Sequence, residues 1–167
     1  MKDALGYTTS YEYDTRGRIT KITNALSQIT QLEYDTRNRI TKITYPGGTY
    51  EQRTFNTADQ LVSVRDPKGY TTTYQYDTYG RLSNVINPLN QTTITYGYDL
   101  MSNITSTTDV AGRVTNYEYN DLNLVKKIIY PAATVNAARL TETFTYDAAG
   151  NLISKTDTAG RTTNMTR

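Results

Sequence analysis

Polar and apolar residues of this chain alternate in short segments, and turn residues interrupt the segments at regular intervals. In one segment Tyr11 and Tyr13 would lie on one face of an extended strand, with Glu12 on the other face. The segment Leu32-Glu33-Tyr34 repeats this alternation. The pattern predicts β-strands with an aromatic face and a polar face.

An aromatic residue followed by Asp or Asn ends seven of these segments, at steps of 21, 21, 21, 22, 21 and 27 residues. The seven pairs are Tyr13-Asp14, Tyr34-Asp35, Phe55-Asn56, Tyr76-Asp77, Tyr98-Asp99, Tyr119-Asn120 and Tyr146-Asp147. A constant period of this length is typical of repeat proteins, in which each unit buries its apolar face against its neighbours. We therefore expect residues 1–167 to form a single array of about seven repeats.

Each pair opens a turn, and a further turn falls between successive pairs. The fifteen opening residues are Asp3, Asp14, Asn24, Asp35, Tyr45, Asn56, Asp66, Asp77, Asn87, Asp99, Asp109, Asn120, Tyr130, Asp147 and Asp157. The fourth turn positions are Gly6, Gly17, Ser27, Asn38, Gly48, Asp59, Gly69, Gly80, Asn90, Ser102, Gly112, Asn123, Gly150 and Gly160, and in the turn that opens at Tyr130 the corresponding residue is Thr134, one position later. Most of these residues tolerate a positive φ, which hairpin turns require at one position. The turns predict about fifteen short strands in an antiparallel, up-and-down order.

The apolar positions that follow each turn predict a bulge. If Asp14 to Arg18 closes a three-residue loop, Tyr13 lies opposite Ile19. If the next turn closes in the same way, Ile22 lies opposite Thr30, yet Ile19 and Ile22 are three residues apart and would face opposite sides of a regular strand. We therefore predict one β-bulge in each repeat, near Thr20-Lys21 and the equivalent positions.

Three departures from the repeat are visible. Arg53 replaces the first aromatic residue in the third repeat, and Gly97 lies in the fifth repeat, which is one residue longer, so we expect a local bulge there. The segment 134–139 makes the sixth interval longer by about six residues and predicts a loop insertion.

Composition supports an all-β chain with a thin core and excludes several classes of function. Apolar residues make up 37% of the chain, the mean hydropathy is -0.64, and 16 tyrosines accompany no tryptophan. The net charge of +2 gives no footprint for nucleic acid, and no apolar run is long enough to span a membrane. Without cysteine or histidine, the chain lacks thiolate metal sites and the commonest general base.

The run from Tyr13 to Thr23, repeated almost unchanged from Tyr34 to Thr44 and closely from Tyr76 to Ile86, resembles the YD repeat of the rearrangement-hotspot (Rhs) family. The resemblance covers essentially the whole chain. It implies one long, curled, antiparallel sheet that forms a section of a spiral β-shell, which in bacterial toxins encloses an effector. Teneurins, wall-associated proteins and insecticidal toxin complexes share the repeat. We expect the chain to be a piece of a longer protein.

The repeat motif supplies the candidate residues, and we assign them a structural role rather than a catalytic one. They are Tyr13, Asp14, Gly17, Arg18, Tyr34, Asp35, Asn38, Arg39, Phe55, Asn56, Tyr76, Asp77, Gly80, Arg81, Tyr98, Asp99, Tyr119, Asn120, Tyr146, Asp147 and Gly150. Carboxylates such as Glu12 and Asp14 recur in register with the turns, so a glycosidase pair is not needed to explain them. Calcium loops would need acidic residues at alternate positions, and we expect no metal or cofactor. Arginines beside tyrosine rows, at 16, 18, 37, 39 and 81, suggest single-stranded nucleic acid, but interleaved glutamates argue for surface contacts with Glu or with aromatic edges.

Three functional hypotheses remain. The first is a scaffold, a section of a shell that encloses or presents a toxin or effector encoded elsewhere. The second is an adhesion or filament module that assembles through open strand edges, and the third is a carbohydrate-binding surface. The expected partners are further repeats of a parent chain, other copies of this chain, an enclosed effector or a surface glycan. We expect a secreted or cell-surface location through a signal outside this chain.

Overall fold

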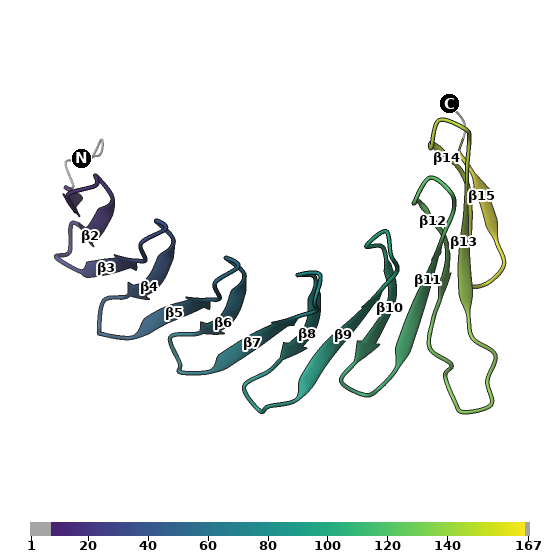
Figure 1. The fold of residues 1–167 in the computed structure, drawn as a ribbon, viewed down its shortest axis with the longest axis horizontal. Helices are drawn as coiled ribbons and strands as arrows, with labels where there is room; N and C mark the ends of the chain where they lie inside the picture. Colours follow the sequence, from purple (N-terminus) through teal and green to yellow (C-terminus); the bar gives the residue numbers. More distant parts are fainter. Residues whose placement is uncertain (1–7, 166–167) are drawn as a thin grey trace. The chain divides into compact units, whose positions relative to one another are not determined.

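The computed structural model describes residues 8–165, and their regular secondary structure is entirely β-strand, which confirms the all-β prediction (Figure 1). The strands are β1 (Ser10–Tyr13), β2 (Ile19–Thr23), β3 (Ile29–Tyr34), β4 (Ile40–Thr44), β5 (Tyr50–Phe55), β6 (Leu61–Arg65), β7 (Thr71–Tyr76), β8 (Leu82–Ile86), β9 (Thr92–Tyr98), β10 (Ile104–Asp109), β11 (Val114–Tyr119), β12 (Val125–Ile129), β13 (Thr141–Tyr146), β14 (Leu152–Thr156) and β15 (Thr162–Asn164).

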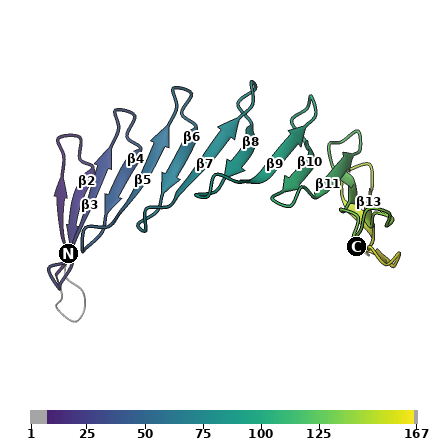
Figure 2. The same cartoon turned by 90° about the horizontal axis from the view of Figure 1, so that it is seen from below.

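Strand order follows chain order from β1 to β15 in a single sheet, as the alternation of turns predicts. The chain divides into two compact units, one of residues 1–74 with 87–89 and the other of residues 75–86 with 90–167. Within each unit, neighbouring strands run in opposite directions (Figure 2). The curl of the sheet and the single array stay predictions.

The strand register confirms the predicted bulge. Tyr13 pairs with Ile19 and Glu12 pairs with Lys21, so Thr20 is the extra residue. On the other side of β2, Ile22 pairs with Thr30. The same shift occurs between Glu33/Tyr34, Thr54/Phe55, Glu118/Tyr119 and Thr145/Tyr146. Because residues that pair across strands share a face, the bulge places Ile19 and Ile22 on the same face as the aromatic residues.

Turn geometry also follows the prediction. The backbone N–H of Asp14 donates to the carbonyl of Arg18 at 2.9 Å, and Gly17 donates back to Asp14 at 3.0 Å. Positive φ angles occur at the predicted fourth positions from Gly17 to Gly160, apart from Thr134, and include the non-glycine residues Ser27, Asn38, Asp59, Asn90, Ser102 and Asn123. The predicted turn from Asp3 to Gly6 lies outside the described residues.

The extra residue of the fifth repeat forms a local bulge, but at Thr93 rather than at the predicted position Gly97. Thr93 is skipped between the pairs Ile86–Thr92 and Val85–Ile94. Gly97 pairs with Ser106 beside the register shift between Ile104 and Ser106, which is the bulge that the other repeats share. A Cβ at position 97 would meet Oγ of Ser106, so that hydroxyl would have to rotate away.

The insertion is a loop, as predicted, but it does not contain the predicted turn ending at Thr134. The backbone N–H of Tyr130 donates to the carbonyl of Leu140 at 2.9 Å, so the loop closes across residues 130–140. Thr134 does not have a positive φ and instead accepts a hydrogen bond from the N–H of Ala137. In the neighbouring turns the N–H of the opening residue donates to the carbonyl of the fifth residue, whereas the inserted residues make Leu140 the acceptor here.

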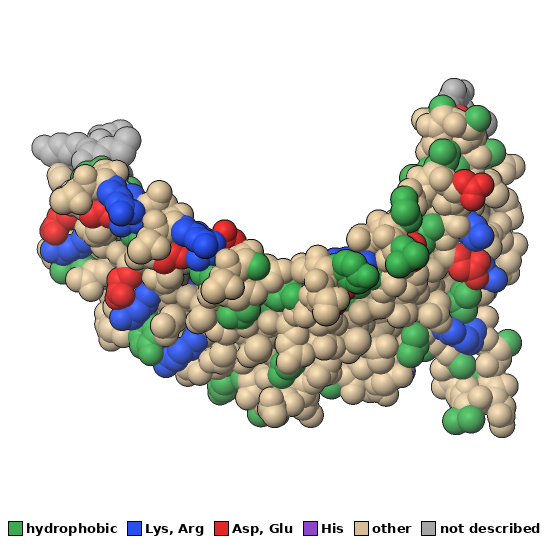
Figure 3. Space-filling model, viewed as in Figure 1, with side chains coloured by type: hydrophobic (Ala, Val, Ile, Leu, Met, Phe, Trp, Pro, Cys, Tyr) green, Lys and Arg blue, Asp and Glu red, His purple; other side chains and the backbone are tan. Residues whose placement is uncertain are grey.

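The sheet has no buried core within residues 8–165, because no described side chain is fully buried. Aromatic and aliphatic side chains on the common face are half-buried by their neighbours within the layer. In the first unit, acidic and basic side chains lie side by side along the surface (Figure 3). Stability therefore depends on contacts between neighbouring strands and turns rather than on a second layer.

Candidate functional site

The predicted motif residues meet at the turns opened by Asp14, Asp35, Asn56, Asp77, Asp99, Asn120 and Asp147, which we call the YD turns and number from one to five within each turn. In the first YD turn, Oδ1 of Asp14 accepts the backbone N–H groups of Arg16 and Arg18 at 2.9 and 3.0 Å. Oδ2 of Asp14 accepts Nε of Arg18 at 2.6 Å and pairs with its terminal nitrogen at 2.6 Å. The Asp side chain thus closes the turn with one oxygen and holds two guanidinium nitrogens of the arginine at position five with the other.

The same contacts recur in other YD turns. Asp35 accepts the N–H groups of Arg37 and Arg39, and its second oxygen accepts Nε of Arg39 at 2.7 Å. Asp77 holds Arg81 through Nε, also at 2.7 Å. The repeated spacing of Asp and Arg, four residues apart, is the signal in the sequence that could have identified this pair.

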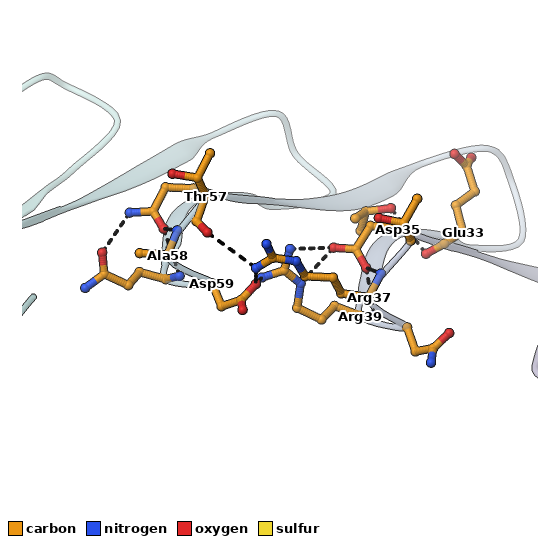
Figure 4. Close-up of polar contacts among 12 residues, drawn as sticks. Glu33, Asp35, Arg37, Arg39, Thr57, Ala58 and Asp59 are labelled. Carbon is orange, nitrogen blue, oxygen red and sulfur yellow. Dashed lines mark hydrogen bonds and ion pairs between the residues drawn. The ribbon is translucent and has the colours of Figure 1, made fainter.

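The arginine at position five reaches the next YD turn. The guanidinium of Arg18 donates to the carbonyl of Asp35 at 3.2 Å and to Oδ1 of Asn38 at 3.0 Å. Arg39 donates to Oδ1 of Asp59 at 2.6 Å, and Arg37 also contacts that oxygen (Figure 4). The turns are therefore joined to one another along the chain.

The guanidinium groups also cover the aromatic residue of the next repeat. Arg18 lies 4.5 Å from the ring centroid of Tyr34, Arg39 lies 4.2 Å from that of Phe55, and a similar contact of 4.4 Å joins Arg81 to Tyr98. These are cation–π contacts with ring faces. The expectation that these three arginines contact aromatic residues is confirmed, although they lie over ring faces rather than edges. The expected Glu partner is wrong, because the Asp of their own turn binds each of them.

The tyrosine hydroxyls make a second contact with the preceding repeat. The hydroxyl of Tyr34 donates to the carbonyl of Ile19 at 2.8 Å, and the equivalent bonds join Tyr98 to Leu82, Tyr119 to Ile104 and Tyr146 to Val125. Burial raises the pKa of Tyr119, chiefly by desolvating its phenol group, and the protonated hydroxyl donates to the carbonyl of Ile104. Phe55 lacks this hydroxyl.

In five of the six successive pairs of YD turns, position five of one turn contacts position four of the next. These residues are Arg18 with Asn38, Arg39 with Asp59, Arg81 with Ser102, Asn103 with Asn123, and Leu124 with Gly150. In the remaining pair, Gln60 is followed by Gly80, which has no side-chain acceptor. A hydrogen-bond donor is followed by an acceptor in the first four contacts. Leu124, which has no donor, is followed by a glycine against which its Cδ1 packs. The residue at position four must therefore adopt a positive φ and also fit the side chain at position five of the preceding repeat.

The carboxylates considered as a glycosidase pair, Glu12 and Asp14, each bind a basic side chain of the sheet. Glu12 pairs with Lys21 at 2.7 Å on the polar face, whereas Asp14 is held by its own turn. Within residues 8–165, no group of three or more His, Cys, Asp and Glu is placed to hold a metal ion. No helix in the described part of the chain is long and apolar enough to cross a membrane.

Comparison with known proteins identifies the family. The model of the RHS Repeat family matches residues 1–29, 13–50, 55–92, 79–114 and 132–162. These matches cover well over half of the chain, and the protein belongs to the RHS repeat family. No curated protein sequence matches the chain.

Solved structures share the fold. The chain superimposes on a structure of TcdB2-TccC3-Cdc42 with a TM-score of 0.72 and 21% identity over 96% of this chain. A Photorhabdus luminescens Tc holotoxin pore gives a TM-score of 0.69 and 21% identity over 95% of this chain. The chain spans 10% and 9% of the length of those two chains, respectively.

We predict that Arg18 and Asn38 are energetically coupled. Asn38→Gly should remove the backbone strain of a non-glycine residue at a φ of 65°. It should also remove the side-chain acceptor for Arg18, so its net effect on stability is small. In an Arg18→Leu background, Asn38→Gly should stabilise the chain, with a coupling free energy of about 0.5–1.5 kcal/mol. Urea unfolding of the four variants measures this free energy.

Ser27→Gly is the matched control for this prediction. Ser27 has a φ of 60° and an exposed side chain that makes no hydrogen bond within residues 8–165. Its replacement should stabilise the chain by about 0.5–1 kcal/mol whether or not Arg18 is present. Equal effects of Asn38→Gly in the two backgrounds would contradict the matching of positions.

We also predict that the YD turns make the protein sensitive to acid. The N–H and then the guanidinium of Arg18 lower the pKa of Asp14, and at Asp35 partial desolvation raises the pKa but hydrogen bonds from Arg39 outweigh it. A pKa lowered by folding contributes stability above the unfolded value of 3.8, and this stability is lost as the pH falls through the folded value. The urea midpoint should therefore fall between about pH 5 and about pH 2.

Asp35→Asn separates this effect from general acid unfolding. Asn opens the turns at Asn24, Asn56 and Asn120, so the variant keeps the turn but cannot titrate. We expect lower stability than wild type at neutral pH and a smaller change in the urea midpoint on acidification. A pH dependence identical to that of wild type would show that Asp35 does not contribute.

Proposed function

We propose that this chain is a non-catalytic section of a β-walled shell that encloses or presents a polypeptide encoded elsewhere. The observation that supports the proposal is that side chains of the YD turns bind groups of the neighbouring repeat. Arg18 contacts its own turn, the next turn and the next aromatic ring. Contacts of this kind join neighbouring repeats, and the groups that make them are already bonded within the sheet rather than directed at a substrate.

The solved structures support the proposal at the level of fold. These structures are of TcdB2-TccC3 assemblies and a Tc holotoxin pore, and their identity to this chain is 21%. The chain matches only a small share of each of those chains, as a section of a larger wall would. We infer that its partners are further repeats of a parent chain, or other copies of itself, together with an enclosed polypeptide. A location outside the producing cell follows from this proposal.

The proposal predicts that the purified chain self-associates. Tyr11 and Tyr13 in β1 are 37% and 59% exposed, and the apolar face has no second layer within the described residues. Sedimentation velocity over a range of concentrations should show growing particles, and electron microscopy should show short or irregular ones. A strictly monomeric chain at every concentration would contradict this prediction, and long polymers with a regular axial repeat would favour the filament module instead.

The coding region next to this sequence tests the enclosed polypeptide directly. A nuclease-like or deaminase-like region downstream, in the same reading frame, supports a toxin shell. An export signal and a stop codon that delimit the repeat array alone would overturn it and favour a surface module.

Carbohydrate binding is a second candidate function, and one observation favours it. Tyr79 is 77% exposed and borders a cavity of about 420 Å³ with Arg81, Tyr98, Leu100 and other residues of this turn and the next. Arg81 lies 5.0 Å from the Tyr79 ring, so the ring is held on one side and open on the other. Exposed, oriented aromatic rings suit the apolar faces of sugars.

A glycan array tests this second function. Binding that is lost in Tyr79→Ala and kept in Tyr70→Ala, where the tyrosine is 58% exposed, would support a sugar site at this cavity. The absence of any binding by wild type at high protein concentration would remove the candidate without affecting the shell proposal.

A further inference from the structure

The inserted loop is not held by the backbone ladder. After Tyr130 N donates to Leu140 O, the only further backbone bond described between residues 131 and 139 is Ala137 N to Thr134 O, at 3.0 Å. Exposed loops with so few backbone bonds are ordinarily mobile. Something other than β-pairing must therefore fix its conformation.

Arg139 makes four hydrogen bonds that tie the base of the loop to two strands. Nε donates to the carbonyl of Tyr130 at 2.7 Å, and one terminal nitrogen donates to Oδ1 of Asn116 at 2.7 Å. The other terminal nitrogen donates to the carbonyls of Val114 at 2.6 Å and Ile129 at 2.9 Å. All four acceptors are neutral. The planar guanidinium carries N–H donors in several fixed directions and can reach all four, whereas the compact ammonium of a lysine could not.

The register of β11 and β12 explains why a donor is needed there. Asn116 pairs with Ile129, so continuing the register by two residues places Pro131 opposite Val114. Proline has no N–H and cannot donate to the facing strand. The guanidinium of Arg139 donates to the Val114 carbonyl in its place.

An arginine also donates to the strand carbonyl that faces a second proline, Pro67. Gln52 pairs with Arg65, so Pro67 falls opposite Tyr50 when the register is continued. The guanidinium of Arg65 donates to the Tyr50 carbonyl at 3.3 Å and lies 4.0 Å from the Tyr50 ring centroid. In both cases an arginine supplies a donor next to the strand residue that faces proline.

We propose that Arg139 is a positioning residue, which replaces the hydrogen bond that Pro131 removes and mounts residues 131–138 as a fixed projection of the sheet. Val135 at 100% exposure is then displayed in one conformation. A loop ordered in advance loses less conformational entropy on contact with another surface than a mobile loop does. This inference does not depend on the shell proposal.

Hydrogen exchange on the complete chain tests the proposal. Arg139→Leu should accelerate amide exchange in residues 132–140 by roughly tenfold or more, since several hydrogen bonds to a charged group are lost together. Arg139→Lys should accelerate it almost as much, because a lysine cannot reach all four acceptors. Arg161→Leu is the matched control, since Arg161 is an exposed arginine whose Nε contacts Asp157 of its own turn at 2.8 Å, and it should leave the loop unchanged.

Pro131→Ala distinguishes the replacement of a donor from general support of the loop. The restored N–H should reduce the excess exchange around Val114 in Arg139→Leu, while having little effect when Arg139 is present. Additive effects of the two substitutions, or wild-type exchange in Arg139→Leu, would overturn the proposal. If Arg139→Leu does not fold, limited proteolysis of Arg139→Lys decides: early cleavage within residues 131–138 supports the proposal, and an unchanged cleavage pattern overturns it.

Discussion

Lateral contact between YD turns is the interaction on which this structure depends. A single β-layer cannot bury its aromatic face as a two-layered domain does, and no described side chain of this protein is fully buried. The planar guanidinium groups compensate by covering rings from within the layer, as Arg18 covers Tyr34 and Arg39 covers Phe55. Each arginine is in turn held by the Asp that closes its own turn. Ring, turn and strand are therefore stabilised by one set of contacts.

Local spacing was sufficient to predict much of the fold from the sequence. The positive φ at Ser27 or Asn38 follows from the turn chemistry, and the bulge at Thr20 follows from the distance between Ile19 and Ile22. Both inferences use residues that are close in the chain. Both are fixed by short-range geometry, which the sequence displays directly.

The remaining features depend on contacts that spacing does not specify. The extra residue of the fifth repeat could lie anywhere between two turns, and the structure places it at Thr93. The arginine at position five and the residue that it meets are about twenty positions apart, as Arg18 and Asn38 are. Arg139 and Val114 are 25 positions apart, across the loop and two strand ends. Side-chain reach between repeats decides these contacts, and the pattern within one repeat does not reveal it.

The hydrogen bonds from position five to position four run in one direction along the chain. Arg18 reaches toward Asn38, and Asn103 reaches toward Asn123, so a repeat that makes this contact donates to its successor. At such a junction, two repeats can exchange places without loss only if the new successor carries a suitable acceptor. Duplication or recombination of repeats is subject to a compatibility rule at those junctions. There, two residues at the boundary constrain the linear order of the units, even though the units themselves are nearly alike.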